Sequence, residues 1–137
     1  MRIPYHFRYH RPMNTSSRKD AAQDFLRLVT QGKIHEAFET HVGPEFRHHN
    51  AYSRSDAASL RKGMEENHAL FPHKILDVRH VVGEGDLVVV HSRMRLAEDK
   101  PEMSLVHVFR FSGERIAELW DTAQPVPQDM ANELGMF

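Results

Sequence analysis

The spacing of hydrophobic side chains predicts helices in the first half of the chain. Apolar residues between positions 21 and 29 recur three and four residues apart, which is the period of an amphipathic helix. A shorter helical pattern begins at Ile34 and should end before Gly43, because the proline that follows cannot continue a helix. Asp56 is a typical N-cap for a third helix, which Phe71-Pro72 closes.

The second half of the chain alternates between apolar and polar positions, which is the period of a β-strand. The predicted strands, separated by turn-forming residues, cover residues 75–82, 87–96, 103–111 and 115–121. A short extended segment at residues 45–50 lies between the second and third helices. A sheet must bury its apolar face, so we expect an α+β fold with the three N-terminal helices on one face of an antiparallel sheet.

Length and composition describe one ordinary globular domain. At 137 residues the chain has room for a single core, and its 40% hydrophobic and 27% charged residues are close to the average. We expect a cytoplasmic protein without membrane contact, because no apolar run reaches the roughly 18 residues of a spanning helix and no secretory signal is apparent. The lack of cysteine excludes disulfides and cysteine nucleophiles.

Positive charge collects at the N-terminus. The first acidic residue, Asp20, is preceded by five basic ones: Arg2, Arg8, Arg11, Arg18 and Lys19. We predict a basic arm at residues 1–15, solvated or loosely docked, and a single domain at residues 16–137. The formal charge of the whole chain is only -1. Without a basic excess over the domain, nucleic acid is not an expected partner.

Common cofactor-binding motifs are missing from the sequence. The chain has no Gly-x-Gly-x-x-Gly segment, no Walker loop and no Gly-x-Ser-x-Gly elbow. Dinucleotide, nucleoside triphosphate and α/β-hydrolase functions therefore lack their minimum signals, and we expect no organic cofactor.

Several segments of the second half resemble one known family. They are Val88-Val89-Val90-His91, Val108-Phe109-Arg110, residues 113–121, residues 124–127 and the terminal Met136-Phe137. Residues 46–50 resemble an aromatic-x-x-His-Asn segment of the same family. In this order and spacing the segments are similar to the SnoaL-like relatives of polyketide cyclases, in the nuclear transport factor 2-like superfamily. The resemblance covers about residues 20 to 137.

The resemblance implies a cone-shaped fold, in which a strongly curved sheet wraps against helices and its interior binds a small apolar or aromatic molecule. Family members commonly form homodimers through the outer face of the sheet. The better-known members close a ring by an intramolecular aldol reaction, without a metal or organic cofactor, and use a pocket aspartate as acid and base. By position, Asp121 is the residue that inherits this role.

Two residues depart from the family pattern. His107 stands where the family strand is expected to carry an aspartate, and Ala51 stands where a proline is expected. The first departure replaces an acid with an imidazole, which is neutral or cationic near pH 7. A direct transfer of the family mechanism therefore depends on what His107 does.

Proton abstraction next to a carbonyl needs a base near the carbon acid and donors aimed at the oxygen that becomes an enolate. We predict Asp121 as the base, with His91 and His107 brought into one cavity because alternate strand residues share a face. His91, His107 or Asn50 would donate to the oxygen of a small apolar or aromatic carbonyl ligand. The predicted substrate-binding residues are His49, Asn50, Leu105, Phe109, Leu119, Trp120 and Gln124.

Other interpretations of the same residues stay open. The cavity can hold a ligand without catalysis, as a binding or accessory domain, and His107 in place of an acid favours this alternative. The eleven histidines also allow a metal site built from His49, His91, His107 and Asp121, as the less favoured hypothesis. Trp120 alternates away from Asp121, so it can instead pack in the core or at a dimer contact.

Overall fold

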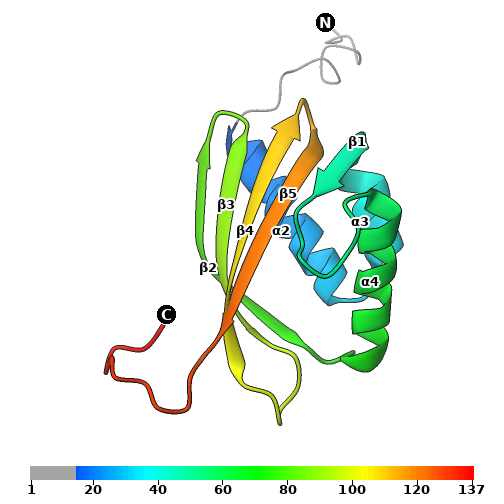
Figure 1. Ribbon diagram of the computed structural model, residues 1–137. Helices are drawn as coiled ribbons and strands as arrows, with labels where there is room; N and C mark the ends of the chain where they lie inside the picture. The colour runs from blue at the N-terminus through cyan, green and yellow to red at the C-terminus, as the bar shows by residue number, and fades with distance from the viewer. Residues whose placement is uncertain (1–14) are drawn as a thin grey trace, which may run out of the picture.

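The computed structural model describes residues 15–137, which form a layer of three helices and a curled sheet of five strands (Figure 1). The helices are α2 (Thr15–Thr30), α3 (Ile34–His41) and α4 (Ala57–Leu70). The strands are β1 (Val42–His48), β2 (Ile75–Glu84), β3 (Leu87–Arg95), β4 (Glu102–Ser112) and β5 (Arg115–Pro125). Apart from Thr15, the predicted basic arm lies outside the described residues.

The three predicted helices are present, and local signals set their ends. Asp56 caps α4 as expected, since its side chain accepts a hydrogen bond from the backbone N–H of Ser59 at 2.9 Å. Gly32 follows α2 with a φ of 81°, a left-handed conformation that glycine adopts easily. None of the helices between residues 15 and 137 is long and apolar enough to cross a membrane.

The strand order in the sheet is β1-β5-β4-β3-β2. Strands β2 to β5 pair antiparallel with their neighbours along the chain, as predicted. Strand β1 instead runs parallel to β5, with Val42 opposite Ile116, so the sheet is mixed rather than wholly antiparallel. Residue alternation identifies a strand but not its partner, which is why the pattern did not specify this parallel edge.

Strand β5 continues to Pro125, four residues beyond its predicted end at Asp121. Pro125 is the last residue of the strand, opposite Met103, and a proline is tolerated where the ladder stops. The extension places Asp121 inside a paired strand rather than at its end before a turn, so its side-chain direction is set by the sheet.

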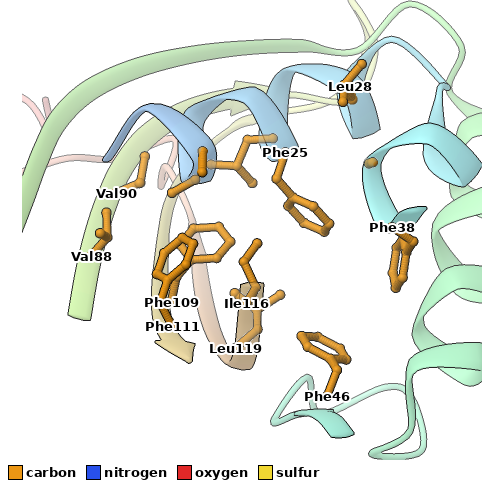
Figure 2. Packing of buried hydrophobic residues seen from close by; sticks show 14 of the residues in the cluster. Phe25, Leu28, Phe38, Phe46, Val88, Val90, Phe109, Phe111, Ile116 and Leu119 are labelled. Atoms are coloured by element: carbon orange, nitrogen blue, oxygen red, sulfur yellow. The ribbon is translucent and has the colours of Figure 1, made fainter. Parts of the chain in front are cut away.

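The core lies between the helices and the inner face of the sheet. Phe25 of α2 packs against Phe109 of β4 with ring centroids 6.0 Å apart, and against Phe38 of α3 at 5.7 Å (Figure 2). Phe109 is fully buried, and Leu119, opposite it in β5, is almost fully buried. These side chains fill the end of the fold near the 112–115 turn, and the packing becomes looser toward the other end of the strands.

We expect Gly32→Ala to lower the free energy of unfolding by about 2–4 kcal/mol. A side chain at this left-handed position is strained, and its Cβ would overlap the imidazole ring of His68. Urea unfolding followed by circular dichroism measures the change. Gly85→Ala is the matched control, because Gly85 has a φ of 58° but no atom within 4 Å of an added Cβ. Equal losses in the two variants would contradict the overlap with His68.

Candidate functional site

A cavity of about 350 Å³ lies where the core stops, between α2, α4, the loop after β1 and the inner face of the sheet. Its apolar lining includes Leu26, Leu60, Leu76, Met94 and Leu105. Polar side chains reach it from several elements, namely Thr30, Asn50, Ser53, Asn67, Lys74, His107 and Asp121. A largely apolar cavity of this size with a few convergent polar groups is typical of a small-ligand site.

His107 and Asp121 lie side by side because they are directly opposite each other in the β4–β5 pair. Opposite residues of an antiparallel pair share a face, with their Cβ atoms about 5 Å apart. The next opposite pair on this face, Phe109 and Leu119, is buried in the core, so the face points inward. The structure therefore brings the predicted base next to one of the two predicted histidines, with Leu105 in the same cavity.

Asn50 holds the Asp121 carboxylate from the loop after β1. Its Nδ2 donates to Oδ1 of Asp121 at 3.1 Å and to Oδ2 at 3.0 Å. The amide is itself oriented, because its Oδ1 accepts a hydrogen bond from the backbone N–H of Tyr52 at 2.9 Å. Just before it, the backbone N–H of His49 donates to the carbonyl of Leu119 at 2.9 Å. The parallel edge strand thus positions Asn50 beside Asp121.

The His107 imidazole is buried and incompletely hydrogen-bonded. Only 8% of the residue is exposed, and its Nδ1 has no hydrogen-bond partner within residues 15–137. Burial lowers the pKa of His107 from 6.5 to about 4, although the negative charge of Asp121 acts in the opposite direction. The ring is therefore neutral near pH 7, with one N–H donor and one acceptor nitrogen. An unpaired buried polar group costs about 1–3 kcal/mol, which makes this one a candidate for ligand contact.

His91 lies on the outer face of the sheet, so the prediction that it shares a cavity with His107 is wrong. In the β3–β4 pair, His107 is opposite Val90, whereas His91 is opposite Val106. A difference of one residue in register reverses the face to which a side chain points, and alternation within each strand does not reveal that register. On the outer face, Nδ1 of His91 is 3.0 Å from Nδ1 of His80.

Three predicted substrate-binding residues also lie on the outer face. The ring of His49 stacks on Trp120 with centroids 5.0 Å apart, and Gln124 is exposed on the same side of β5. Their predicted placement in the pocket is wrong: Trp120 and Gln124 alternate with the inward-facing Asp121 along β5, and His49 lies against Trp120 and Glu118 on the outer face. Phe109 and Leu119 do point inward, but they belong to the core and do not line the cavity. The predicted residues that line it are Asn50, Leu105, His107 and Asp121.

Glu118 is a buried carboxylate at the centre of an ionic cluster on the outer face, and the sequence did not predict this cluster. Its carboxylate accepts hydrogen bonds from Nε2 of His49 at 2.7 Å, from Arg47 at 3.2 Å and from Arg110 at 3.1 Å. These bonds, of which that from His49 has the largest effect, lower the pKa of Glu118 to about 2. The cluster joins β1, β5 and β4, and it fixes the residue immediately before Asn50. Its sequence signal was a glutamate flanked by apolar residues on both sides in Ile116-Ala117-Glu118-Leu119-Trp120.

Lys74 and Asn67 line the cavity and were not among the predicted site residues. Nζ of Lys74 donates to Oδ1 of Asn67 at 2.9 Å, and burial lowers the pKa of Lys74. Lys74 comes just before β2, where nothing in the spacing distinguishes it from an ordinary solvated lysine. Its place at the cavity depends on the pairing of β2, which begins at Ile75, with β3, and the residues around Lys74 do not specify this pairing.

The alternative metal set does not assemble. His49 and His91 lie on the outer face, while His107 and Asp121 lie on the inner face. Within the part of the chain that the structure describes, no three histidine, aspartate or glutamate side chains are grouped so that they could hold a metal ion. The described polar lining therefore consists of one carboxylate, one neutral imidazole, one lysine, side-chain amides and hydroxyl groups.

The fold and cavity define a nuclear transport factor 2-like, or cystatin-like, α+β protein. AclR, a provisionally assigned hydroxylase from Streptomyces galilaeus, has a similar structure, with a TM-score of 0.71 and 19% identity over 81% of this chain and 91% of that chain. A provisionally assigned polyketide cyclase from Acidithiobacillus ferrooxidans is also similar, with a TM-score of 0.67 and 21% identity over 82% of this chain and 92% of that chain. An NTF2-like protein of unknown function from Cytophaga hutchinsonii has a TM-score of 0.65 and 14% identity over 82% of this chain and 94% of that chain. At these identities, the structures show the fold alone.

The chain belongs to the SnoaL-like domain family, whose model matches residues 6–119. The match confirms the resemblance that the sequence segments indicated. No curated protein matches this chain in sequence. Family and fold together support a cavity for a small molecule and leave the chemistry to be inferred from the side chains that line it.

The stability of the protein should depend on keeping His107 neutral. Because folding lowers the pKa of His107 from 6.5 to about 4, the unfolded chain binds more protons between these pH values. Stability should therefore fall as the pH drops through this window, by about 3 kcal/mol more in the wild type than in His107→Gln. Urea unfolding at a series of pH values measures the difference. Ile34→Val, which shortens a buried side chain outside the cavity and removes no titratable group, should keep the wild-type pH dependence. The same dependence in His107→Gln would contradict the assignment.

Proposed function

We propose that this protein is a small-molecule enzyme that carries out acid/base chemistry on a carbonyl compound in the cavity. The observation that carries the proposal is the unpaired buried nitrogen of His107 beside the Asp121 carboxylate, which Asn50 holds in place. The apolar lining favours an apolar or aromatic substrate, and the volume of about 350 Å³ favours a small one.

In the proposed reaction, Asp121 takes a proton from the carbon next to the substrate carbonyl. The electron pair of the broken C–H bond forms a carbon–carbon double bond, the π pair of the carbonyl moves onto its oxygen, and the enolate oxygen receives a hydrogen bond from the Nδ1–H tautomer of His107. In an isomerisation, Asp121 returns the proton to a different carbon. In an aldol condensation or ring closure, the enolate carbon attacks a second carbonyl, and the proton goes to the oxygen of that carbonyl.

His107 suits the donor role better than the aspartate expected at this position. Two carboxylates opposite each other would repel, and one of them would have to hold a proton. A neutral imidazole leaves Asp121 as the single anion and supplies an N–H group toward the developing oxyanion. A positioned base contributes about 10²–10⁴ in rate and an oxyanion donor about 10²–10³. Asn50 acts as a positioning residue that fixes the carboxylate.

Asp121→Asn should slow proton abstraction by about 10²–10⁴-fold, because the amide keeps the shape of the carboxylate but cannot accept the proton. The measurement is the exchange of the acidic C–H protons of a small aromatic ketone, 2-tetralone, in D₂O, followed by proton NMR. Asp99→Asn, in the exposed loop between β3 and β4, is the matched control and should exchange at the wild-type rate. Wild-type exchange in Asp121→Asn would rule out this base.

A non-catalytic small-ligand-binding or accessory domain is the second candidate function. The observation that favours it is His107 itself, which stands where the family is expected to carry an acid. The exchange assay separates the two candidates. If the wild-type protein binds 2-tetralone in a calorimetric titration but does not accelerate its exchange, the binding function replaces the enzymatic one.

We also infer a homodimer that forms through the outer face of the sheet. Exposed apolar side chains line this face on β2 and β3, namely Ile75, Val82, Leu87 and Val89. Val82 and Val89 are directly opposite each other in the β2–β3 pair, so they form one continuous patch. A self-complementary contact about a twofold axis would cover such a patch on both copies.

The double variant Val82→Lys with Val89→Lys should be a monomer, because two new charges on each copy would have to be buried in the contact. Sedimentation velocity measures the change in mass. Leu70→Lys provides the control, since Leu70 is an equally apolar residue that is 74% exposed on α4, away from the sheet. If the double variant and the wild type have the same mass, this face is not the contact.

A further inference from the structure

Lys74 is a cation inside the cavity without an anionic partner. Its Nζ donates to the neutral Oδ1 of Asn67 at 2.9 Å. Within residues 15–137, no carboxylate oxygen lies within 4.0 Å of this nitrogen, and its one hydrogen-bond partner is uncharged. An ammonium group has three N–H donors, so two remain for other partners. Partial removal of a charge from water is costly unless a counter-charge is present.

The cavity is electrically polarised. Among the residues between 15 and 137 that line it, Lys74 is the one cation and Asp121 is the one anion, since burial keeps His107 neutral near pH 7. Burial also lowers the pKa of Lys74, because it disfavours the charged ammonium form. An anion bound beside the ammonium would favour the charged form and so offset this effect. The lining therefore lacks an anion at the Lys74 end.

The two charged groups are well separated across the inner face of the sheet. Lys74 comes just before β2, whereas Asp121 lies on β5, and strands β3 and β4 separate them. Three strand spacings correspond to about 14 Å along the sheet. The floor between them is apolar, formed by Leu76, Met94 and Leu105. A ligand that fills the cavity thus meets a cation, an apolar floor and the acid/base pair in that order.

We propose that the substrate is an apolar or aromatic carbonyl compound that also carries a carboxylate, which Lys74 and its partner Asn67 hold while the carbonyl lies at Asp121 and His107. This inference rests on the proposed function, because it takes the cavity as the substrate site. Lys74 thus gives the cavity its preference for a ligand with a carboxylate, and it also fixes the direction in which that ligand lies. The reversed ligand would place its carboxylate against Asp121, where the two like charges repel.

The test compares two ligands of the same shape, the anion 2-naphthoate and the neutral ketone 2-acetylnaphthalene, by isothermal titration calorimetry with the full chain. The wild type should bind 2-naphthoate about tenfold more tightly, because the Lys74 ammonium can form a charge-assisted hydrogen bond with the carboxylate that the neutral ketone lacks. Lys74→Met should abolish this preference while leaving the affinity for 2-acetylnaphthalene unchanged or higher, which shows that the cavity is intact. Lys74→Arg keeps the charge and should keep the preference.

Equal affinities of the wild type for both compounds, no binding of either, or a full preference in Lys74→Met would each overturn the proposal. The measurement involves no turnover, so it is independent of whether Asp121 is a base. Asp121→Asn should still prefer 2-naphthoate through Lys74. If that variant exchanges 2-tetralone at the wild-type rate while Lys74→Met loses the preference, the proposed catalysis fails and the anion site stands.

Discussion

The register of the β4–β5 pair is the constraint on which the rest of the structure depends. It places Phe109 opposite Leu119 and, two residues along, His107 opposite Asp121. Both pairs lie on the inner face, so the same alternation that builds the core also builds the polar wall of the cavity. A slip of β5 by one residue would turn Leu119 and Asp121 to the outer face together, away from Phe109 and His107. The free energy of burying Phe109 and Leu119 therefore also maintains the contact between His107 and Asp121.

The second wall of the site depends on charges that never enter the cavity. Glu118 is buried on the outer face, and its desolvation is offset by hydrogen bonds from His49, Arg47 and Arg110. These bonds hold the end of β1 against β5, and the chain then turns inward so that Asn50 meets Asp121. An ionic cluster on one face thus positions an amide on the other.

Features that depend on local spacing could be predicted from the sequence, and features that depend on the pairing of distant segments could not. Helical and strand periods predicted the elements, and Asp56 marked the start of α4. Asp121 and Asn50 came from the family resemblance rather than from any period. The prediction for His91 was wrong because His91 and His107 have similar apolar neighbours and the same alternation along their strands. Only the register between β3 and β4 shows that the two side chains point to different faces. Lys74 carried no local signal at all.

Unpaired buried groups do not by themselves identify a site, and the cavity is what separates one of them from the others. Within residues 15–137, three buried side-chain atoms lack a hydrogen-bond partner: Nδ1 of His68, Oγ of Ser92 and Nδ1 of His107. His68 packs against Gly32, and Ser92 is enclosed between neighbouring strands. Of these three residues, His107 is the one that lines the cavity of about 350 Å³. A ligand that forms a hydrogen bond with this nitrogen would remove the desolvation penalty of an unpaired buried atom, about 1–3 kcal/mol. That is a large share of the total stability of a typical domain, about 5–15 kcal/mol, and the atoms of His68 and Ser92 remain unpaired.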